Sequence, residues 1–364
     1  MKVKDIIKKI EELCPPNYAE DFDNIGLLVG NRQAVVSGIL ITLDTLESVV
    51  DESIAKKCNL IVSFHPIIFG GLKSLTGKTY VERVVMKAIR HDIAIYSMHT
   101  ALDNTIYGVN AAIADTLGLS AREILIPQKN TLRKLVTYIP VNQSDMLRKA
   151  LFEAGAGDIG NYSECSFNIE GTGTFTAAAD ANPSVGKIGV PQHEPETQIG
   201  VIFPKHLQRN ILAALQKNHP YEEVAYEIYS IENEHQHIGL GMVGTLENPL
   251  SENDFLAFLK EKMNASCVRH SELTGKIVQK VAVLGGSGAF AIEAAKSAGA
   301  DAFVSADFKY HDFFKAENTI LLADIGHFES EQFTKNLLFE YLTKKIPNFA
   351  IILSETNTNP IQYY

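Results

Sequence analysis

Two residues of metal-binding type lie four positions apart near the C-terminal end of the chain. His327 and Glu331 belong to the segment DIGHFESEQF (324–333), where a predicted strand passes into a predicted helix. At this spacing both side chains lie on one face of a helix and are close enough to share one ion. A simpler interpretation stays open, because Glu331 could merely complement the helix dipole while His327 is an ordinary loop residue.

Three further candidates follow predicted strands in the N-terminal part of the chain. His65 follows the apolar run NLIVSF (59–64), His99 follows IAIYSM (93–98), and Asp103 lies four residues beyond His99. Sites in open α/β sheets form beyond the carboxyl ends of strands, so these side chains are candidates for one site. Imidazole and carboxylate groups suit Zn²⁺, Fe²⁺ or Mn²⁺, and a bridging carboxylate could hold two ions that promote hydrolysis.

A glycine turn offers a competing function. Gly286 and Gly288 begin a G-x-G-x-x-A motif after a predicted strand, and Asp307 lies near the position expected of a ribose-binding acid. This is the form of a dinucleotide fingerprint, but an ordinary tight turn between strand and helix requires the same glycines. Asp307 and His311, in the segment SADFKYHDFF (305–314), either line the same cleft or begin a helix. Both alternatives stay open.

Short apolar runs alternate with amphipathic stretches at both ends of the chain. The strand-like runs are 38–44, 59–64 and 93–98 within residues 1–130, and 280–286, 301–307, 318–326 and 348–355 within residues 233–364. Alternation of this kind indicates βαβ units around a mostly parallel sheet. We therefore predict that the two segments form one discontinuous, three-layer α/β domain that carries the metal site.

The middle of the chain, residues 131–232, has a different order of elements. A strand (134–141) and a helix ending in glycine (144–155) precede two strand-like stretches, 162–171 and 173–179; a strand, a helix and a strand follow. The order β-α-β-β-(β)-α-β fits a ferredoxin-like α+β unit. We predict an inserted domain here, and one larger continuous α/β domain is the alternative.

The composition is that of an ordinary globular protein and narrows the classes of function. The 364 residues include 33 Lys and Arg against 43 Asp and Glu, a formal net charge of −10, whereas nucleic-acid binders normally present a basic face. No apolar run approaches the ~18 residues of a membrane-spanning helix, and the charged N-terminal segment is unlike a signal peptide. The four cysteines form no C-x-x-C pair. We expect a reduced, cytoplasmic protein with no membrane partner, and nucleic acid is an unfavoured partner.

Several of these segments are similar to the motifs of a known family. They are AEDFDNIGLLVG (19–30), ILITLD (39–44), SFHPIIF (63–69), SMHTALDN (97–104), VLGGSG (283–288), SADFKYHD (305–312) and ADIGHFESE (323–331). In this order they resemble the GTP cyclohydrolase 1 type 2 homolog family, also called the Ngg-one-interacting-factor-three-like family. Residues 131–232 resemble the PII-like insert of its longer bacterial members. The resemblance implies a toroidal homohexamer with a dinuclear metal site in each subunit.

The resemblance also assigns roles to individual residues. It implies four metal ligands, namely His65, Asp103, His327 and Glu331. Glu331 would bridge two ions, and His99 would lie beside the ligands to orient a group or transfer a proton. Phe64 lines the same cleft and departs from the family, which usually has two adjacent histidines in this motif. We therefore expect one or two divalent ions per subunit, zinc or iron and alternatively manganese.

The expected function is that of a metal-dependent, hydrolase-like protein. Its reaction would open the ring of GTP or a related nucleotide-type substrate through metal-bound hydroxide. One alternative is a non-enzymatic metal-binding regulator or chaperone that acts as an oligomeric ring. A second alternative is a nucleotide-binding module that uses the turn at Gly286 and Gly288.

Overall fold

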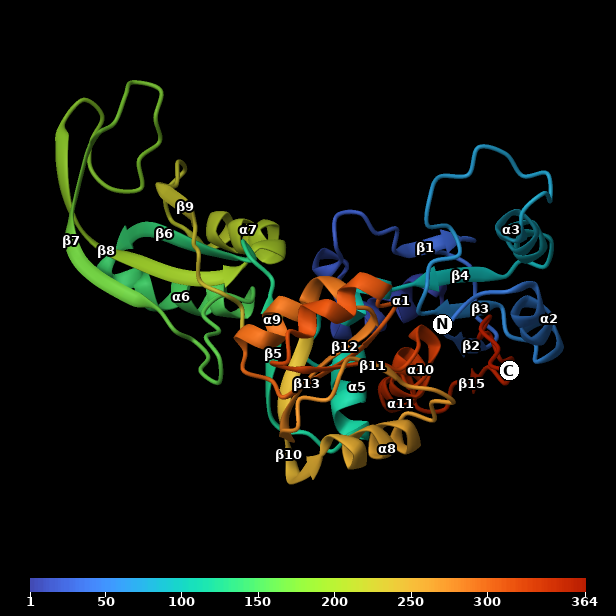
Figure 1. Cartoon of the computed structure of the whole chain (residues 1–364). Helices are drawn as coiled ribbons and strands as arrows, with labels where there is room; N and C mark the ends of the chain where they lie inside the picture. The colour runs from blue at the N-terminus through green and yellow to red at the C-terminus, as the bar shows by residue number, and fades with distance from the viewer. The chain divides into compact units, whose positions relative to one another are not determined.

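The computed structural model describes residues 1–364 and consists of two compact units (Figure 1). The first unit contains Met1–Pro127 and His237–Tyr364, and the second contains Gln128–Gln236. The predicted insert, residues 131–232, therefore falls within the second unit. None of the helices combines the length and the apolar character that crossing a membrane requires.

The first of two sheets in the larger unit is mostly parallel. In spatial order its strands are β1 (Gly26–Val29), β4 (Ala94–Ser97), β3 (Leu60–Ser63), β2 (Ile39–Thr42) and β15 (Ile351–Leu353). Strands β4 to β15 are parallel, and β1 is an antiparallel edge strand. Every residue of β2, β3 and β4 is buried, as expected of parallel strands that are covered on both faces.

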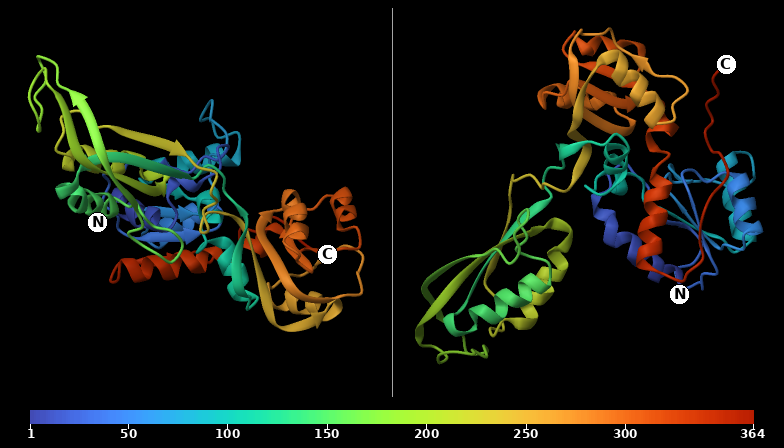
Figure 2. Two further views of the ribbon diagram at one scale, coloured as in Figure 1. Left: turned by 90° about the vertical axis from the view of Figure 1, so that its left-hand side faces the viewer. Right: turned by 90° about the horizontal axis from the view of Figure 1, so that it is seen from below.

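Helices cover both faces of this sheet. The helices of the larger unit are α1 (Val3–Leu13), α2 (Glu47–Ala55), α3 (Tyr80–Arg90), α4 (His99–Asp103), α5 (Val109–Thr116), α8 (Glu252–Lys262), α9 (Ile292–Ser297), α10 (His327–Glu331) and α11 (Thr334–Lys345). Leu40 of β2 packs with residues of α2 and α3, whereas its neighbours Ile39 and Ile41 pack on the opposite side with α1 and α11. Figure 2 shows α11, in red, beside the blue strands. The sequence prediction of a layered α/β domain is confirmed.

The second sheet of the larger unit is mixed. In spatial order its strands are β11 (Arg269–His270), β14 (Leu321–Asp324), β13 (Ala302–Ala306), β12 (Ile277–Ser287), β10 (Gly239–Ser251) and β5 (Ser120–Pro127). Strands β12, β13 and β14 are parallel, and the others pair antiparallel. One apolar cluster contains Leu60 of the first sheet together with Val281 and Val304 of the second. The two sheets therefore share a core, which fixes the strand ends of one relative to those of the other.

The sequence missed the antiparallel strands and the division into two sheets. Strands β1 and β5 have mostly half-exposed or exposed residues, so they lack the continuous apolar run that reveals a buried parallel strand. Strand β15 also joins the first sheet beside β2, although it follows the strands of the second sheet along the chain. Pairing between distant segments decided these features.

The smaller unit is a four-stranded antiparallel sheet with helices on one face. Its elements are β6 (Leu132–Pro140), α6 (Ser144–Glu153), β7 (Phe167–Thr176), β8 (Pro191–Pro204), α7 (Gln208–Asn218) and β9 (Tyr226–Ser230), in the spatial strand order β7-β8-β6-β9. This is the ferredoxin-like arrangement. Ile199, Val201 and Phe203 of β8 pack with Leu147 of α6 and Ile211 of α7. Figure 2 shows both green helices on the same side of the sheet.

A single strand, β7, replaces the two stretches that the sequence predicted, 162–171 and 173–179. Gly171 and Gly173 stay paired with Glu196 and Glu194 of β8, so the ladder is not interrupted. An added Cβ at Gly173 would lie 2.1 Å from the Oε2 atom of Glu196. The glycine therefore makes space for a neighbouring side chain and does not end a strand.

The chain leaves and re-enters the larger unit at adjacent positions, since Pro127 of β5 is the pairing partner of Gly239 of β10. We expect a variant that lacks residues 128–236, closed by a linker of about four Gly and Ser residues, to fold and to bind metal like the full chain. Circular dichroism and metal analysis check both properties. Aggregation of the variant with every linker tried would mean that the insert belongs to the core of the larger unit.

The carboxylate of Glu52 in α2 fastens the C-terminal segment. It accepts hydrogen bonds from Ser354 Oγ (2.6 Å), the Glu355 N–H (2.9 Å) and Thr356 Oγ1 (2.7 Å). Burial alone would raise the pKa of Glu52, but the hydrogen bonds outweigh burial and lower the pKa to about 2. The ionised carboxylate thus stabilises the folded protein above the unfolded-state pKa, and this stability is lost as pH falls toward the folded-state pKa.

Glu52→Gln is expected to lower the free energy of unfolding at neutral pH by about 1–3 kcal/mol, because a charged hydrogen-bond acceptor is lost. The difference from the unaltered protein should shrink as pH falls below about 4.5, where the unfolded chain takes up the proton. Urea unfolding at a series of pH values measures it. Glu47→Gln is the matched control, since Glu47 forms an exposed ion pair with Arg83. A difference that does not change with pH would contradict the assignment.

Candidate metal centre

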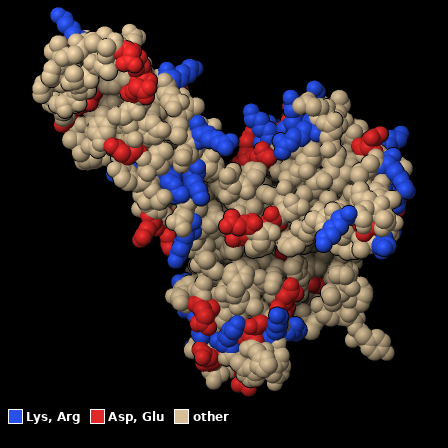
Figure 3. All heavy atoms as spheres, turned by 90° about the horizontal axis from the view of Figure 1, so that it is seen from above, with Lys and Arg blue, Asp and Glu red and all other residues tan.

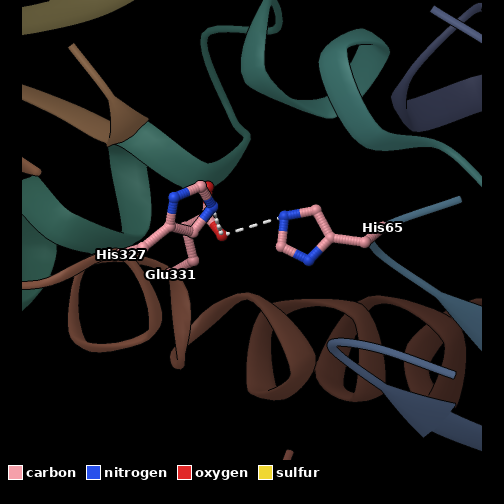
Figure 4. A group of neighbouring side chains, drawn as sticks. All are labelled: His65, His327 and Glu331. Carbon is pink, nitrogen blue, oxygen red and sulfur yellow. Dashed lines mark ion pairs between the residues drawn. The ribbon is translucent and has the colours of Figure 1, made fainter. Parts of the chain in front are cut away.

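Three side chains from the two sheets of the larger unit converge at one point (Figure 4). His65 follows strand β3, whereas His327 and Glu331 are the first and last residues of α10, which follows β14. One ligand atom from each residue lies within 4.8 Å of the others. Glu331 Oε2 is 3.2 Å from Nε2 of His65 and 3.2 Å from Nε2 of His327. The dashed lines in Figure 4 mark these two ion pairs.

A separate carboxylate orients each imidazole. His65 Nδ1 lies 2.8 Å from Asp44 Oδ1, and His327 Nδ1 lies 2.8 Å from Asp307 Oδ2. Each contact leaves Nε2 directed at Glu331. Histidines that bind metals usually donate their other N–H group to a carboxylate in this way, which fixes the tautomer and the ring orientation. Asp44 is in turn held by Thr358 Oγ1 at 2.7 Å, so the C-terminal segment supports the site.

Glu331 is the buried anion at the centre of this group. Its side chain is 4% exposed, and Oε2 lacks a partner with hydrogen-bond geometry despite the two close Nε2 atoms. Burial alone would raise the pKa of Glu331, but the two imidazoles outweigh burial and lower it to about 2. Burial alone would lower the pKa values of the histidines, but their carboxylate neighbours raise them to about 10 for His65 and about 11 for His327. Because an imidazole must lose its proton to bind a metal, a divalent ion would replace protons here.

Asp103, the last residue of α4, lies outside the compact group of three. Its Oδ1 atom is inaccessible to solvent and has no hydrogen-bond partner. Burial and then the charge of Glu331 raise the pKa of Asp103 well above its usual range. Buried polar atoms without partners are rare, and a bound cation would satisfy this one. The residues present therefore fit a divalent ion with imidazole and carboxylate ligands.

His99 stands beside the group and not within it. Its ring lies edge-on to His65 with centroids 5.3 Å apart, and its Nδ1 atom is 2.9 Å from Asp23 Oδ1. The other oxygen of Asp23 accepts hydrogen bonds from the N–H and hydroxyl groups of Thr100. The ring of His99 is thus held in one orientation by a carboxylate that is itself held in place.

Phe64 lies in the core and packs against the rings of His65 and His99. It is fully buried, and its ring centroid lies 4.9 Å from that of His65 and 5.5 Å from that of His99. It therefore forms an apolar wall behind the imidazoles and does not line an open cleft. His311, in contrast, lies away from His65, His327 and Glu331. It is exposed on a short 3₁₀ helix, η5 (Tyr310–Ala316), with its ring against that of Tyr310.

The glycine turn packs against the candidate metal ligands. Gly286 has a φ of +68°, and an added Cβ would lie 2.5 Å from Glu331 Oε1; at Gly288 it would lie 1.9 Å from Ser305 Oγ. The second glycine of such a motif lets a phosphate approach the backbone, but here Ser305 occupies the space next to Gly288, and Glu331 occupies the space next to Gly286. Asp307, the acid that the nucleotide motif would direct to a ribose, contacts His327 instead. This geometry favours the structural interpretation of the glycines.

Sequence reasoning missed the two carboxylates that orient histidines from the N-terminal half. Asp44 directly follows strand β2 and its flanking Leu43, the same position after a strand that drew attention to His65. A rule that collects every acidic residue at such a position would have found Asp44. Asp23 lies in a loop before β1 and within the family motif 19–30, but nothing in that motif indicates a contact with His99, which lies 76 residues further along the chain.

Glu331→Gln is expected to weaken Zn²⁺ binding by more than about 100-fold, since loss of a residue that merely orients a ligand already costs about 10–100-fold. His99→Ala should keep the metal, because His99 lies outside the group of three. Elemental analysis after dialysis and titration with a zinc indicator measure both variants, and His311→Ala is the exposed control. Equal metal loss from the Glu331 and His99 variants would show that His99 is a ligand.

Comparisons with known proteins extend over the whole chain. The sequence model of Duf34/NIF3 (NGG1p interacting factor 3) matches residues 1–360. A Bacillus subtilis protein named GTP cyclohydrolase 1 type 2 homolog is 38% identical over 373 residues, covering 99% of this chain and 98% of that protein. A Staphylococcus aureus protein of the same name is 34% identical over 367 residues and covers 100% of both chains.

Solved structures agree with these matches. A Bacillus cereus protein related to NIF3 superposes with a TM-score of 0.87 at 36% identity, covering 100% of this chain and 99% of that chain. Staphylococcus aureus protein SA1388 superposes with a TM-score of 0.81 at 31% identity and the same coverage. These matches confirm the resemblance of the sequence motifs. The chain belongs to the Duf34/NIF3 (NGG1p interacting factor 3) family.

Proposed function

We propose that this protein is a metal-dependent hydrolase that opens the ring of GTP or a related nucleotide-type substrate. The observation that carries the proposal is the convergence of His65, His327 and Glu331 ligand atoms within 4.8 Å, with a carboxylate orienting each imidazole. These residues would hold one divalent ion, zinc or iron and alternatively manganese, and Asp103 offers a further carboxylate oxygen. The names of the relatives supply the substrate class.

A bound divalent ion supplies Lewis acidity, which makes water a nucleophile at neutral pH. Opening the imidazole ring of a purine adds one water to form a formamide, and a second water releases formate. His99, whose ring lies beside that of His65, would carry out the proton transfers that these steps need. Its Nδ1 atom is engaged by Asp23, so Nε2 is the atom that would exchange a proton with the substrate.

A pair of exposed aromatic rings, one of them beside His99, supports a flat, heteroaromatic substrate. Phe22 is 67% exposed and Phe69 is 55% exposed. Their ring centroids lie 6.4 Å apart, and the Phe69 ring lies 6.2 Å from the His99 ring. Large apolar side chains exposed together mark binding surfaces, and aromatic rings stack on bases of any sequence. Phe69 would hold the base while His99 acts on it.

The charge distribution favours a free small molecule over a nucleic acid. On the face in Figure 3, Lys and Arg side chains are interspersed with Asp and Glu, and the whole chain has a formal net charge of −10. A nucleic-acid surface would normally show a continuous basic patch.

A turnover screen tests the proposal. The protein is loaded separately with zinc, iron or manganese and incubated with GTP and a panel of other nucleotides, and formate release and the loss of purine absorbance are followed. We expect metal-dependent product that disappears with chelator and with His65→Ala, a raised KM for Phe69→Ala, and no change for His311→Ala. No metal-dependent product from any nucleotide would overturn the hydrolase and favour a metal-binding regulator or chaperone.

A second comparison distinguishes the hydrolase from a nucleotide-binding module. A module that uses the glycine turn would still bind nucleotide after His65→Ala and would lose it with Gly286→Val. The hydrolase site predicts that Gly286→Val also releases metal, because a side chain there collides with Glu331 Oε1. Metal retention by Gly286→Val together with loss of nucleotide binding would favour the module.

A further inference from the structure

The smaller unit contains a cavity of about 630 Å³ on the face of its sheet that α6 and α7 leave uncovered. The floor is made by Tyr138, Gln198 and Ile169, which are neighbours across strands β6, β8 and β7. Ile199 and Val201 alternate with Gln198 along β8 and point into the helix-covered core instead. The volume lies in the range of small-molecule sites, about 300–1,000 Å³.

Loop residues roof this face of the sheet. The connection from β7 to β8 folds over the floor and is tied to the segment before β9, since the Asn182 N–H donates to Glu222 Oε1 at 2.8 Å. The walls are mostly apolar and are formed by Phe175, Ala177, Ala178, Pro183, Val185 and Ala225. A sheet face that would otherwise meet water thus becomes an apolar-walled pocket.

One carboxylate inside the pocket is fixed in place. Glu196 is 9% exposed, and its Oε1 atom accepts a 2.7 Å hydrogen bond from the Tyr221 hydroxyl. The carboxylate lies over Gly173, where no larger residue would fit. The Tyr221 N–H donates to His219 Nδ1 at 3.1 Å, and the other ring nitrogen of His219 lies 2.8 Å from the Tyr138 carbonyl oxygen. The chain of contacts holds Tyr221, and through it Glu196, in one position.

The charge of the residues that line the cavity indicates the class of ligand. Three carboxylates line the cavity, Glu196, Glu222 and Glu223, and no Lys, Arg or His is among the lining residues. Burial of an anion favours a cationic partner that forms charge-assisted hydrogen bonds. The aromatic rings of Tyr138, Phe175 and Tyr221 suit the apolar body of a ligand or the face of its cation.

We propose that this cavity binds a small organic cation, an ammonium or guanidinium group on an aromatic or aliphatic body, with Glu196 as the partner of its charge. The site lies in the insert and stands independently of the metal centre and of the proposed hydrolase activity.

Calorimetric titration and ligand-observed NMR on the full chain test the proposal. Phenethylamine, 2-phenylethanol and phenylacetate share one aromatic body and differ in charge, and agmatine presents a guanidinium on an aliphatic body. We expect the unaltered protein to bind at least one of the two cations at least about tenfold more tightly than the neutral and anionic probes. Equal affinity for the three aromatic probes, or binding of neither cation, would overturn the proposal.

Two variants locate the binding. Glu196→Gln keeps the shape and an acceptor for the Tyr221 hydroxyl and should weaken cation binding by at least about tenfold. Gly171→Leu should abolish it, because Gly171 lines the cavity and an added Cβ there meets no atom within 4 Å. Glu170→Gln, an exposed position of β7 outside the lining, is the matched control and should bind like the unaltered protein. Cation binding by folded Gly171→Leu at the unaltered affinity would place the site elsewhere.

Discussion

The burial of one carboxylate, that of Glu331, constrains the centre of the larger unit. An ionised carboxyl group with almost no solvent contact must be compensated by nearby positive charge. Two imidazoles provide the compensation at 3.2 Å each, and each is in turn held by its own carboxylate. The arrangement places alternating charges in one small volume, with imidazole nitrogens and carboxylate oxygens as candidate ligands. A divalent cation fits this environment because it replaces two protons and leaves every ligand with a partner.

The same compensation depends on the two sheets sharing a core. His65 comes from the end of a strand in one sheet and Glu331 from a helix that follows a strand in the other. Residues of both sheets pack into one apolar cluster, so the separation of these side chains is set by core packing. The glycines at the end of β12 complete the fit, since Gly286 leaves just enough space for the Glu331 carboxylate. Rigid positioning of this kind is what a metal site or a catalytic site requires.

The insert also contains a buried carboxylate that a neighbouring side chain holds in place. A four-stranded sheet with helices on one face leaves the other face open, and here the long β7–β8 connection covers it. The cover creates a pocket whose only buried ionisable lining group, Glu196, is again a carboxylate held by a neighbour, in this case the hydroxyl of Tyr221. Both units therefore contain a buried carboxylate that is held in place, which suits a divalent ion in the larger unit and the proposed organic cation in the insert.

The local sequence pattern predicted many of the strands and site residues of the larger unit. The continuous apolar runs of β2, β3 and β4 predicted buried parallel strands. The four-residue spacing of His327 and Glu331 predicted that both side chains lie on one face of a helix, which is α10. Those features depend only on residues that lie within a few positions of one another along the chain, which is why the sequence alone reveals them. The family motifs also directed attention to His65, which lies in the group of three.

Tertiary structure alone decided which distant residues meet. The sequence indicated neither that Asp44 and Asp307 hold the imidazoles nor that Gly286 faces the Glu331 carboxylate. Each of these contacts joins residues that belong to or follow different strands of one sheet, and the order of strands in a sheet is decided by tertiary pairing. It also could not reveal the antiparallel edge strands, whose half-exposed residues lack a continuous apolar run. The cavity of the insert likewise exists only because a loop folds over a sheet face. Side-chain type and spacing fix local geometry, whereas the packing of a shared core fixes distances between elements.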